Sequence, residues 1–391
     1  MTAKQPKSPH FNIVQKIWRE VKRPFKKVGR KMRQSFRGLQ GKLFALLPIS
    51  PETDELPAFI SVEASTLCQL KCLHCNIRND FGIIGKGFLK YIDFKKFLDN
   101  HEFIKRIELS SYGEIFLNPE LSEIIKYAHS KKVELTANSG VNFNTVKDEM
   151  LELLVKCKFN SLCIAVDGAS QEIYSQYRVN GNFDTVISNI KKLNKYKMKY
   201  NSEFPKLRWQ YVIMSHNECE VAKAKILAKA LDMEIFFKLT WDPGYVPTNV
   251  EMLRKETGLK HFTRDDYEKD FDTAYIVPCH QLFTRPQINW DGRLLGCCCQ
   301  RKDDFGVNVF EVGLKKALNS KQYTYAKKML RGKVTQPKFR IASNPCSKCS
   351  IAKRILANDN YLSLPGAVKR ENIAKRFIGA LKRFFAKKSQ T

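Results

Sequence analysis

Cysteine residues are concentrated in three short stretches of this chain. Twelve cysteines occur among the 391 residues, and these stretches hold Cys68, Cys72 and Cys75, then Cys297, Cys298 and Cys299, then Cys346 and Cys349. A disulfide scaffold is typical of a short secreted chain with more even spacing. Clustered cysteines in a chain that lacks the apolar core of a secretory signal favour bound metal instead.

The first stretch, Cys68-Gln-Leu-Lys-Cys72-Leu-His-Cys75, has the spacing C-x3-C-x2-C and follows a predicted strand over Phe59–Glu63. Three thiolates on one short loop can ligate three irons of a 4Fe–4S cluster and leave the fourth iron open to a small molecule. A structural zinc site needs four protein ligands, and His74, between two of the cysteines, is poorly placed to be the fourth. A zinc-bound loop is the alternative hypothesis.

Strand-like and helix-like segments alternate between residues 59 and 239. The predicted strands are Phe59–Glu63, Arg106–Ser110, Val133–Ala137, Leu162–Val166, Trp209–Met214 and Ile235–Leu239. The predicted helices are Phe94–Asn100, Pro119–Ser130, Thr145–Cys157, Phe183–Tyr196 and Val221–Leu231. This order predicts an α/β fold with a parallel sheet and right-handed crossovers. About 180 residues are too few for eight units, so we expect a partial (β/α)6 barrel of the TIM type with the cysteine loop at its active-site end.

With this cysteine triplet after the first strand, the chain resembles the radical S-adenosylmethionine superfamily over roughly residues 55–350. The resemblance implies that the open iron binds the amino and carboxylate groups of S-adenosylmethionine. It further implies that an electron from the reduced cluster cleaves this cofactor to methionine and a 5′-deoxyadenosyl radical, which takes a hydrogen atom from the substrate. A reducing flavodoxin or ferredoxin is the implied electron donor.

The segment Ser111-Tyr112-Gly113-Glu114 follows the second predicted strand and resembles the family's Gly-Glu motif. The resemblance assigns Glu114 to the methionine ammonium of the cofactor, while Gly113 allows close approach of the backbone. Ile115 stands where the family usually has proline. The remaining cofactor contacts that the resemblance implies are His74 beside adenine, Asn138 at the methionine or ribose part, and Asp167 at the ribose.

Arg178 resembles an arginine of the subfamily that carries extra clusters, and we name it as the candidate catalytic residue. It would bind a substrate carboxylate or phosphate, or take part in proton transfer; a surface salt bridge is the alternative. Asn217 and Glu220 follow the fifth predicted strand, where the resemblance suggests a structural or adenine-side role. A helix N-cap explains Asn217 equally well.

Four further cysteines are candidate ligands of a second metal site: Cys279, Cys297, Cys346 and Cys349. Their spacing resembles the opening of the SPASM and twitch extensions of radical enzymes, with Trp290-Asp291-Gly292 as a hairpin turn. No cysteine follows Cys349, so we expect one auxiliary 4Fe–4S cluster, and two clusters per chain. Zinc is the alternative metal, and the neighbouring Cys298 or Cys299 is the alternative to Cys297.

Positive charge is concentrated at the two ends of the chain. The chain has a net charge of +29; residues 1–50 contribute +12 and residues 366–391 contribute +7. Apolar residues recur there at helical spacing between the basic ones, which predicts basic amphipathic helices at both termini. The predicted domains are a basic extension (1–50), a radical core (51–270), a SPASM/twitch-like Fe–S domain (271–355) and a basic tail (356–391).

These features leave three hypotheses for function. The first is a radical enzyme that oxidises or rearranges a polar small molecule, such as a sugar, a cyclitol or a lipid-linked glycoconjugate, with the auxiliary cluster as electron acceptor. The second is a peptide- or protein-modifying maturase, disfavoured here because residues 1–50 lack the strand pattern of a leader-binding winged-helix domain. The third is a zinc-cluster nucleic-acid binder. Since basic residues are concentrated at the ends, we expect no DNA partner.

The expected reduced clusters predict a cytoplasmic protein, and the basic ends predict that it lies peripherally on the anionic inner face of the membrane. The alternatives are basic helices that are solvated or pack on the body of the protein, and ends that bind RNA or an acidic partner. Each basic residue near an anionic membrane surface contributes about 1 kcal/mol. We therefore expect full-length protein to co-sediment with anionic vesicles, and the segment 51–365 to bind them less. Equal binding by both proteins, or binding that is indifferent to lipid charge, would contradict this expectation.

Overall fold

A curved sheet of eight strands organises the residues that the computed structural model describes, which are 56–357 except 76, 79, 272–273 and 332–343. Its strand order is β6-β5-β4-β3-β2-β1-β7-β8, and all neighbours are parallel except β7 and β8. The strands are β1 (Phe59–Val62), β2 (Arg106–Glu108), β3 (Glu134–Val141), β4 (Ser161–Ala165), β5 (Lys206–Ile213), β6 (Glu234–Leu239), β7 (Gln287–Ile288) and β8 (Leu294–Gly296).

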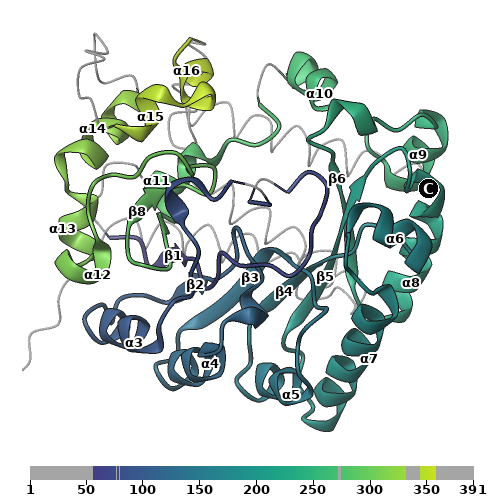
Figure 1. Ribbon diagram of the computed structural model, residues 1–391, viewed down its shortest axis with the longest axis horizontal. Helices are drawn as coiled ribbons and strands as arrows, with labels where there is room; N and C mark the ends of the chain where they lie inside the picture. Colours follow the sequence, from purple (N-terminus) through teal and green to yellow (C-terminus); the bar gives the residue numbers. More distant parts are fainter. Residues whose placement is uncertain (1–55, 76, 79, 272–273, 332–343, 358–391) are drawn as a thin grey trace, which may run out of the picture. The chain divides into compact units, whose positions relative to one another are not determined.

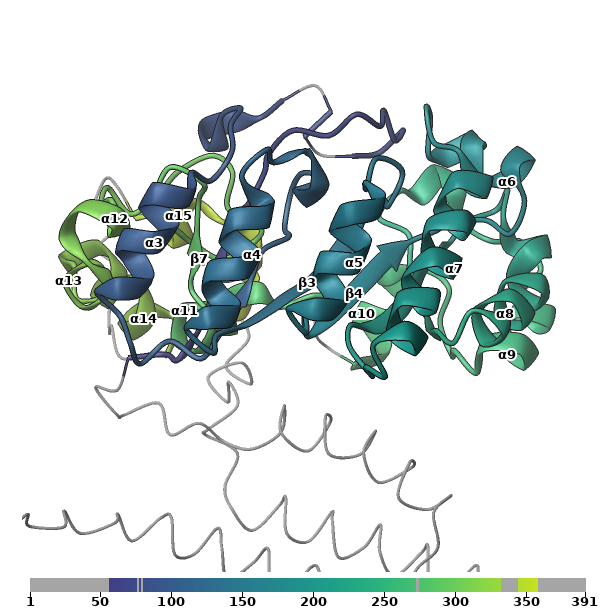
Figure 2. The same cartoon turned by 90° about the horizontal axis from the view of Figure 1, so that it is seen from below.

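Helices cover the outer side of this sheet (Figures 1 and 2). They are α3 (Tyr91–Asp99), α4 (Leu121–Ser130), α5 (Asp148–Lys156), α7 (Phe183–Lys199) and α8 (Val221–Ala230). Their apolar faces pack on strand residues such as Ile107, Leu162 and Trp209, each fully buried in one continuous core. Burial stabilises each such side chain by about 1.5–3 kcal/mol, so the core fixes which side of every strand faces inward.

The opposite, concave side of the sheet is polar. Ser61, Glu108, Thr136 and Ser161 pair directly across the neighbouring strands β1 to β4, so their side chains share one face. All but Ser161, which is half-buried, are buried, and Thr136 Oγ1 donates to Glu108 Oε2 at 2.7 Å. A polar inner face on an apolar scaffold is suited to a polar ligand.

The six expected strands and their parallel order are confirmed. The helix α6 (Gln171–Tyr177) was missed, although Ser170 caps it by accepting from Ile173 N at 3.4 Å. Pro119 is not the first helical residue, because α4 begins at Leu121.

The hairpin predicted around Gly292 is confirmed, with Gly292 at a φ of +89° in the turn between β7 and β8. This hairpin extends the main sheet at β1, so the sheet crosses the domain boundary expected at residue 270. The helices of the C-terminal half are α9 (Val250–Thr257), α10 (Arg264–Phe271), α11 (Gln281–Thr284), α12 (Val309–Val312), α13 (Leu314–Leu318), α14 (Lys321–Leu330), α15 (Pro345–Lys348) and α16 (Ser350–Ala357).

The basic helices predicted at the two termini lie outside the described residues. Among the helices that the structure does describe, none combines the length and the apolar character that crossing a bilayer requires.

The segment 80–87, which follows the first cysteine loop, is hydrogen-bonded to the turn of the β7–β8 hairpin and to the loop after β8. Ile84 O accepts from Trp290 Nε1 at 2.8 Å, and Ile83 N donates to Arg301 O at 2.9 Å. Gly82 has a φ of +53°, and a Cβ there would lie 2.1 Å from Arg301 O. Only glycine permits this close approach. The contact joins the segment that follows Cys75 to the segment that follows Cys299.

We expect Gly82→Ala to destabilise the protein more than Gly258→Ala does. Both glycines have positive φ, +53° and +70°, but nothing lies within 4 Å of a Cβ at Gly258. The left-handed conformation costs about 1–2 kcal/mol in each variant, and only Gly82→Ala adds a backbone clash. Urea unfolding of both variants measures the difference; equal losses would show that segment 80–87 does not depend on this contact.

Candidate functional site

The cysteine loop after β1 lies at the carboxyl end of the parallel strands. Cys72 is buried, Cys75 is half-buried and Cys68 is exposed. The loop is fixed at its start by the turn after β2, because Gly113 N donates to Ser65 O at 3.0 Å. Burial raises the pKa of the Cys72 thiol, so without a bound cation this thiol stays protonated.

Glu114 and Gly113 lie where the sequence predicted, against the cysteine loop. A Cβ at Gly113 would lie 2.4 Å from Ser65 O, so the close approach requires glycine. The buried Glu114 accepts from Phe116 N at 3.2 Å and from Asn142 N at 2.5 Å. Burial raises its pKa to about 7.

Asn142 is a residue that the sequence reasoning missed. Its Nδ2 lies 3.5 Å from Cys68 Sγ, and its backbone N–H is bound by Glu114. The sequence pointed to Asn138, whose Oδ1 instead accepts from Ser161 Oγ at 3.1 Å. The predicted strand stopped at Ala137, whereas β3 continues to Val141, which makes Asn142 the first residue after the strand.

Asp167 and Arg178 form a buried ion pair beside the cysteine loop. Asp167 Oδ2 lies 2.7 Å from Arg178 Nε and 2.6 Å from Nη2, while Asp167 Oδ1 accepts from Val212 N at 2.7 Å. Arg178 Nη1 lies 3.7 Å from Cys72 Sγ. The side chains are 0 % and 14 % exposed, so Arg178 does form the salt bridge considered as its alternative role, but not at the surface.

His74 lies in an aromatic cluster at the same end of the sheet. Its ring stacks on Tyr177 with centroids 6.1 Å apart and meets the edge of Tyr245 at 4.8 Å. Its Nδ1 contacts Asp242 Oδ2 at 2.6 Å, while its Nε2 has no hydrogen-bond partner in the described part of the chain. An aromatic environment with a free ring nitrogen is compatible with the adenine-side position predicted for His74.

Asn217 stands at the N-cap position of a short 3-10 helix, η4 (Glu218–Glu220), but its side chain makes no capping hydrogen bond. Its Nδ2 donates to Val212 O at 2.9 Å and to Asp167 O at 3.2 Å, and Glu220 Oε2 accepts from Ala169 N at 2.6 Å. The predicted N-cap position is thus correct but the capping hydrogen bond is not made, and both side chains hold the loop after β4 that carries Asp167.

Glu63 is a second residue that the sequence did not single out. It is fully buried at the end of β1, and its Oε1 accepts from Tyr112 N at 3.2 Å and Gly113 N at 3.4 Å. Its Oε2 is buried without a hydrogen-bond partner among the described residues. Burial, together with the nearby Glu108, raises its pKa to about 8.

The four cysteines of the expected second site line one cavity. Besides apolar side chains and Gln300, its wall contains five thiols: Cys279, Cys297, Cys299, Cys346 and Cys349. Cys298 is not among the lining residues, and its backbone N–H donates to Gln281 Oε1 at 2.8 Å. In the described ranges no three His, Cys, Asp or Glu side chains converge closely enough to hold a single metal ion.

Tyr112 lies between the two groups of cysteines. With Cys75 it packs against a small apolar cluster of Ile77, Ile84 and Leu295, and its hydroxyl donates to Gln300 O at 3.1 Å. Burial, together with Cys297, raises the pKa of Tyr112 well above its usual value. The loop of the Gly-Glu motif therefore touches both cysteine regions.

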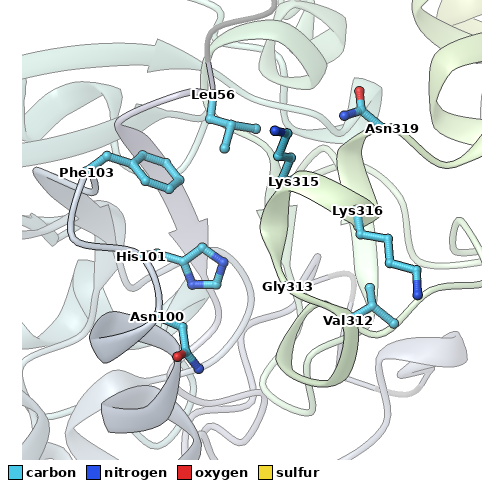
Figure 3. A pocket seen from close by; sticks show the side chains of 9 residues that line it. All are labelled: Leu56, Asn100, His101, Phe103, Val312, Gly313, Lys315, Lys316 and Asn319. Carbon is cyan, nitrogen blue, oxygen red and sulfur yellow. The ribbon is translucent and has the colours of Figure 1, made fainter.

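A wide cavity of about 540 Å³ lies elsewhere (Figure 3). It is lined by residues before β1 and β2, including Leu56 and His101, and by Lys315 and Lys316 of α13. These residues lie at the amino ends of the strands, opposite the cysteine loop. Both ring nitrogens of His101 are engaged there, since its Nε2 accepts from Leu314 N at 2.9 Å and its Nδ1 contacts Phe97 O at 2.7 Å.

The sequence profile of the Radical SAM superfamily matches residues 62–204. This range contains the first cysteine loop, Glu114, and the Asp167–Arg178 pair. Residues 62–204 are therefore similar to the radical SAM superfamily, and this similarity concerns that part of the chain.

Known proteins resemble this chain in sequence and fold. The antilisterial bacteriocin subtilosin biosynthesis protein AlbA of Bacillus subtilis is 28% identical over 145 residues, which are 36% of this chain and 31% of AlbA. The chain thus matches less than a third of the length of this curated relative.

Streptococcus suis SuiB has a similar fold. The structure bound to S-adenosylmethionine gives a TM-score of 0.53 at 14% identity, covering 89% of this chain and 85% of SuiB. The structure bound to the precursor peptide SuiA gives 0.52 at 15% identity, covering 81% and 76%. At these identities the likeness concerns the fold alone.

We expect Glu63→Gln to stabilise the protein increasingly as pH rises. The folded pKa of about 8 exceeds the ordinary 4.5, so between these values the folded state holds a proton that the unfolded state has released. Wild-type stability therefore falls by up to about 1.4 kcal/mol per pH unit over this window, and glutamine removes that loss.

Urea unfolding between pH 5 and pH 8.5 measures this difference. Glutamine keeps the acceptor for Tyr112 N and Gly113 N, so these contacts are preserved. A stability difference that stays constant with pH would show that Glu63 ionises normally.

Proposed function

We propose that this protein is a radical S-adenosylmethionine enzyme that modifies a peptide or protein. The observation that carries the proposal is the sequence match to AlbA, a bacteriocin biosynthesis protein. The fold of SuiB, which has been crystallised with its precursor peptide, adds support. This favours the second sequence hypothesis over the first, because the comparisons offer no support for a sugar, cyclitol or lipid-linked substrate.

Cys68, Cys72 and Cys75 would hold the first 4Fe–4S cluster. Three free thiols on one loop suit such a cluster, and the first two have N–H donors beside their sulfurs. When bound, the cluster and S-adenosylmethionine supply one-electron cleavage of the cofactor and a carbon radical that abstracts hydrogen.

The chain's own residues would bind and orient the cofactor. Glu114, buried and held by two backbone N–H groups, is placed to accept from an ammonium group, which would restore its ionised form. His74 offers an aromatic face and an unpartnered ring nitrogen to adenine. Both oxygens of Asp167 are engaged by Arg178 and Val212, so a ribose contact would use their remaining lone pairs.

Cys279, Cys297, Cys346 and Cys349 would hold an auxiliary 4Fe–4S cluster, with Cys299 as the alternative to Cys297 because both line the cavity. All four ligands then come from protein, and the cluster accepts or passes electrons without binding substrate. Zinc, the alternative metal, would need four thiols gathered around one ion, and the described residues show no such convergence.

We expect about eight irons per chain after anaerobic reconstitution, four for each cluster. Replacing Cys68, Cys72 and Cys75 together with alanine should leave about four and abolish formation of 5′-deoxyadenosine. A Cys157→Ala variant, which changes a cysteine outside both groups, is the matched control. Unchanged iron in the triple variant would exclude the first site.

The substrate class is tested with deuterated substrates. Wild-type protein with a deuterated candidate precursor peptide should change the peptide mass and transfer deuterium to 5′-deoxyadenosine, and the triple variant should do neither. Transfer from a sugar or cyclitol, with none from peptides, would overturn the peptide proposal while leaving the radical chemistry intact.

A further inference from the structure

The backbone on both sides of Cys72 is paired with the backbone on both sides of Arg178. Lys71 N donates to Val179 O at 3.0 Å, and Leu73 N donates to Tyr177 O at 3.3 Å. These two bonds hold the end of α6 across the cysteine loop. Arg178 therefore keeps its place over Cys72 without relying on the side chain alone.

The donors of the Arg178 guanidinium are divided between one carboxylate and one sulfur. Nε and Nη2 bind Asp167 Oδ2, and Nη1 lies 3.7 Å from Cys72 Sγ. Asp167 is itself anchored by Val212 N. The pair is nearly closed to solvent, so its charges are weakly screened at the sulfur.

We propose that Arg178 is a positioning residue that raises the reduction potential of the cluster held by Cys72, through its charge and its N–H donated to the Cys72 sulfur. The inference rests on the proposed function, which places a 4Fe–4S cluster there. Reduction adds one electron and one negative charge to the cluster, and a fixed cation with an N–H donor to a ligand sulfur stabilises the reduced form.

Asp167 has the opposite effect on the potential. Its carboxylate offsets part of the guanidinium charge while it holds the guanidinium in place. Removing the arginine should therefore lower the potential, and neutralising the aspartate should raise it. If the two residues only stabilised the loop, replacing them would not shift the reduction potential in opposite directions.

The test is a redox titration of the reconstituted full-length protein, followed by the EPR signal that changes on addition of S-adenosylmethionine. Arg178→Gln should make the midpoint potential more negative by about 59 mV, a tenfold smaller constant for one-electron reduction. Asp167→Asn should make it more positive. Arg106→Gln, which removes an exposed arginine paired with Glu134, is the charge-matched control and should leave it unchanged.

An unchanged or more positive potential in Arg178→Gln would overturn the inference, as would shifts of the same sign in both variants. Loss of Arg178 leaves Asp167 as an unpaired buried charge. If Arg178→Gln does not assemble a cluster, the potential of Asp167→Asn decides: a shift to more positive values supports the inference, and any other result overturns it.

The iron content distinguishes failure of this inference from failure of the proposed function. A wild-type protein without a cluster at Cys68, Cys72 and Cys75 contradicts the proposed function, whereas a normal cluster with unchanged potentials contradicts only this inference.

Discussion

Hydrogen bonds from the surrounding strand-end loops hold the cysteine loop in place, and the rest of the site depends on them. Residues 66–75 contain no helix or strand of their own, so no internal ladder of bonds fixes their shape. The turn at Gly113 holds the beginning of the loop, and the end of α6 holds the part around Cys72. These contacts come from segments about 45 and 105 residues away along the chain, which only a parallel sheet with aligned carboxyl ends brings together.

The concave side of the sheet concentrates buried acidic groups at this same edge. Glu63, Glu114 and Asp167 are all buried, and burial of a carboxylate is costly unless it is paired or protonated. Asp167 is paired with Arg178, whereas Glu63 and Glu114 receive only backbone N–H groups and have raised pKa values. Such perturbed groups next to three thiols are typical of a functional site, and their cost is offset by the apolar core beneath the sheet.

The hairpin of β7 and β8 makes the second group of cysteines part of the same structure. It adds to the sheet at β1, and it fastens the chain after Cys75 through Trp290 and Arg301. Tyr112 packs between the two groups. The relation between the cysteine groups is thus set by a continuous sheet and by packed backbone, not by a linker between separate domains.

The sequence by itself determined the α/β class, the six strands, the cysteine loop after the first strand and the Gly-Glu turn. These follow from local signals: apolar runs of strand length, cysteine spacing, and a glycine where the backbone must come close. The hairpin turn at Gly292 was predictable for the same reason. The sequence pattern did not identify the substrate, because strand-end loops vary freely and carry no periodic signal.

Only the tertiary structure decided which polar side chains meet. Asn142, which the sequence did not single out, lies beside Cys68 because β3 runs four residues beyond its predicted end. Arg178 turned from a substrate candidate into the partner of Asp167 and Cys72, since the fold buries it against both. Glu63 carries no motif, and its importance lies in a missing hydrogen bond, which depends on every neighbour that packs around it and so cannot be read from residue order.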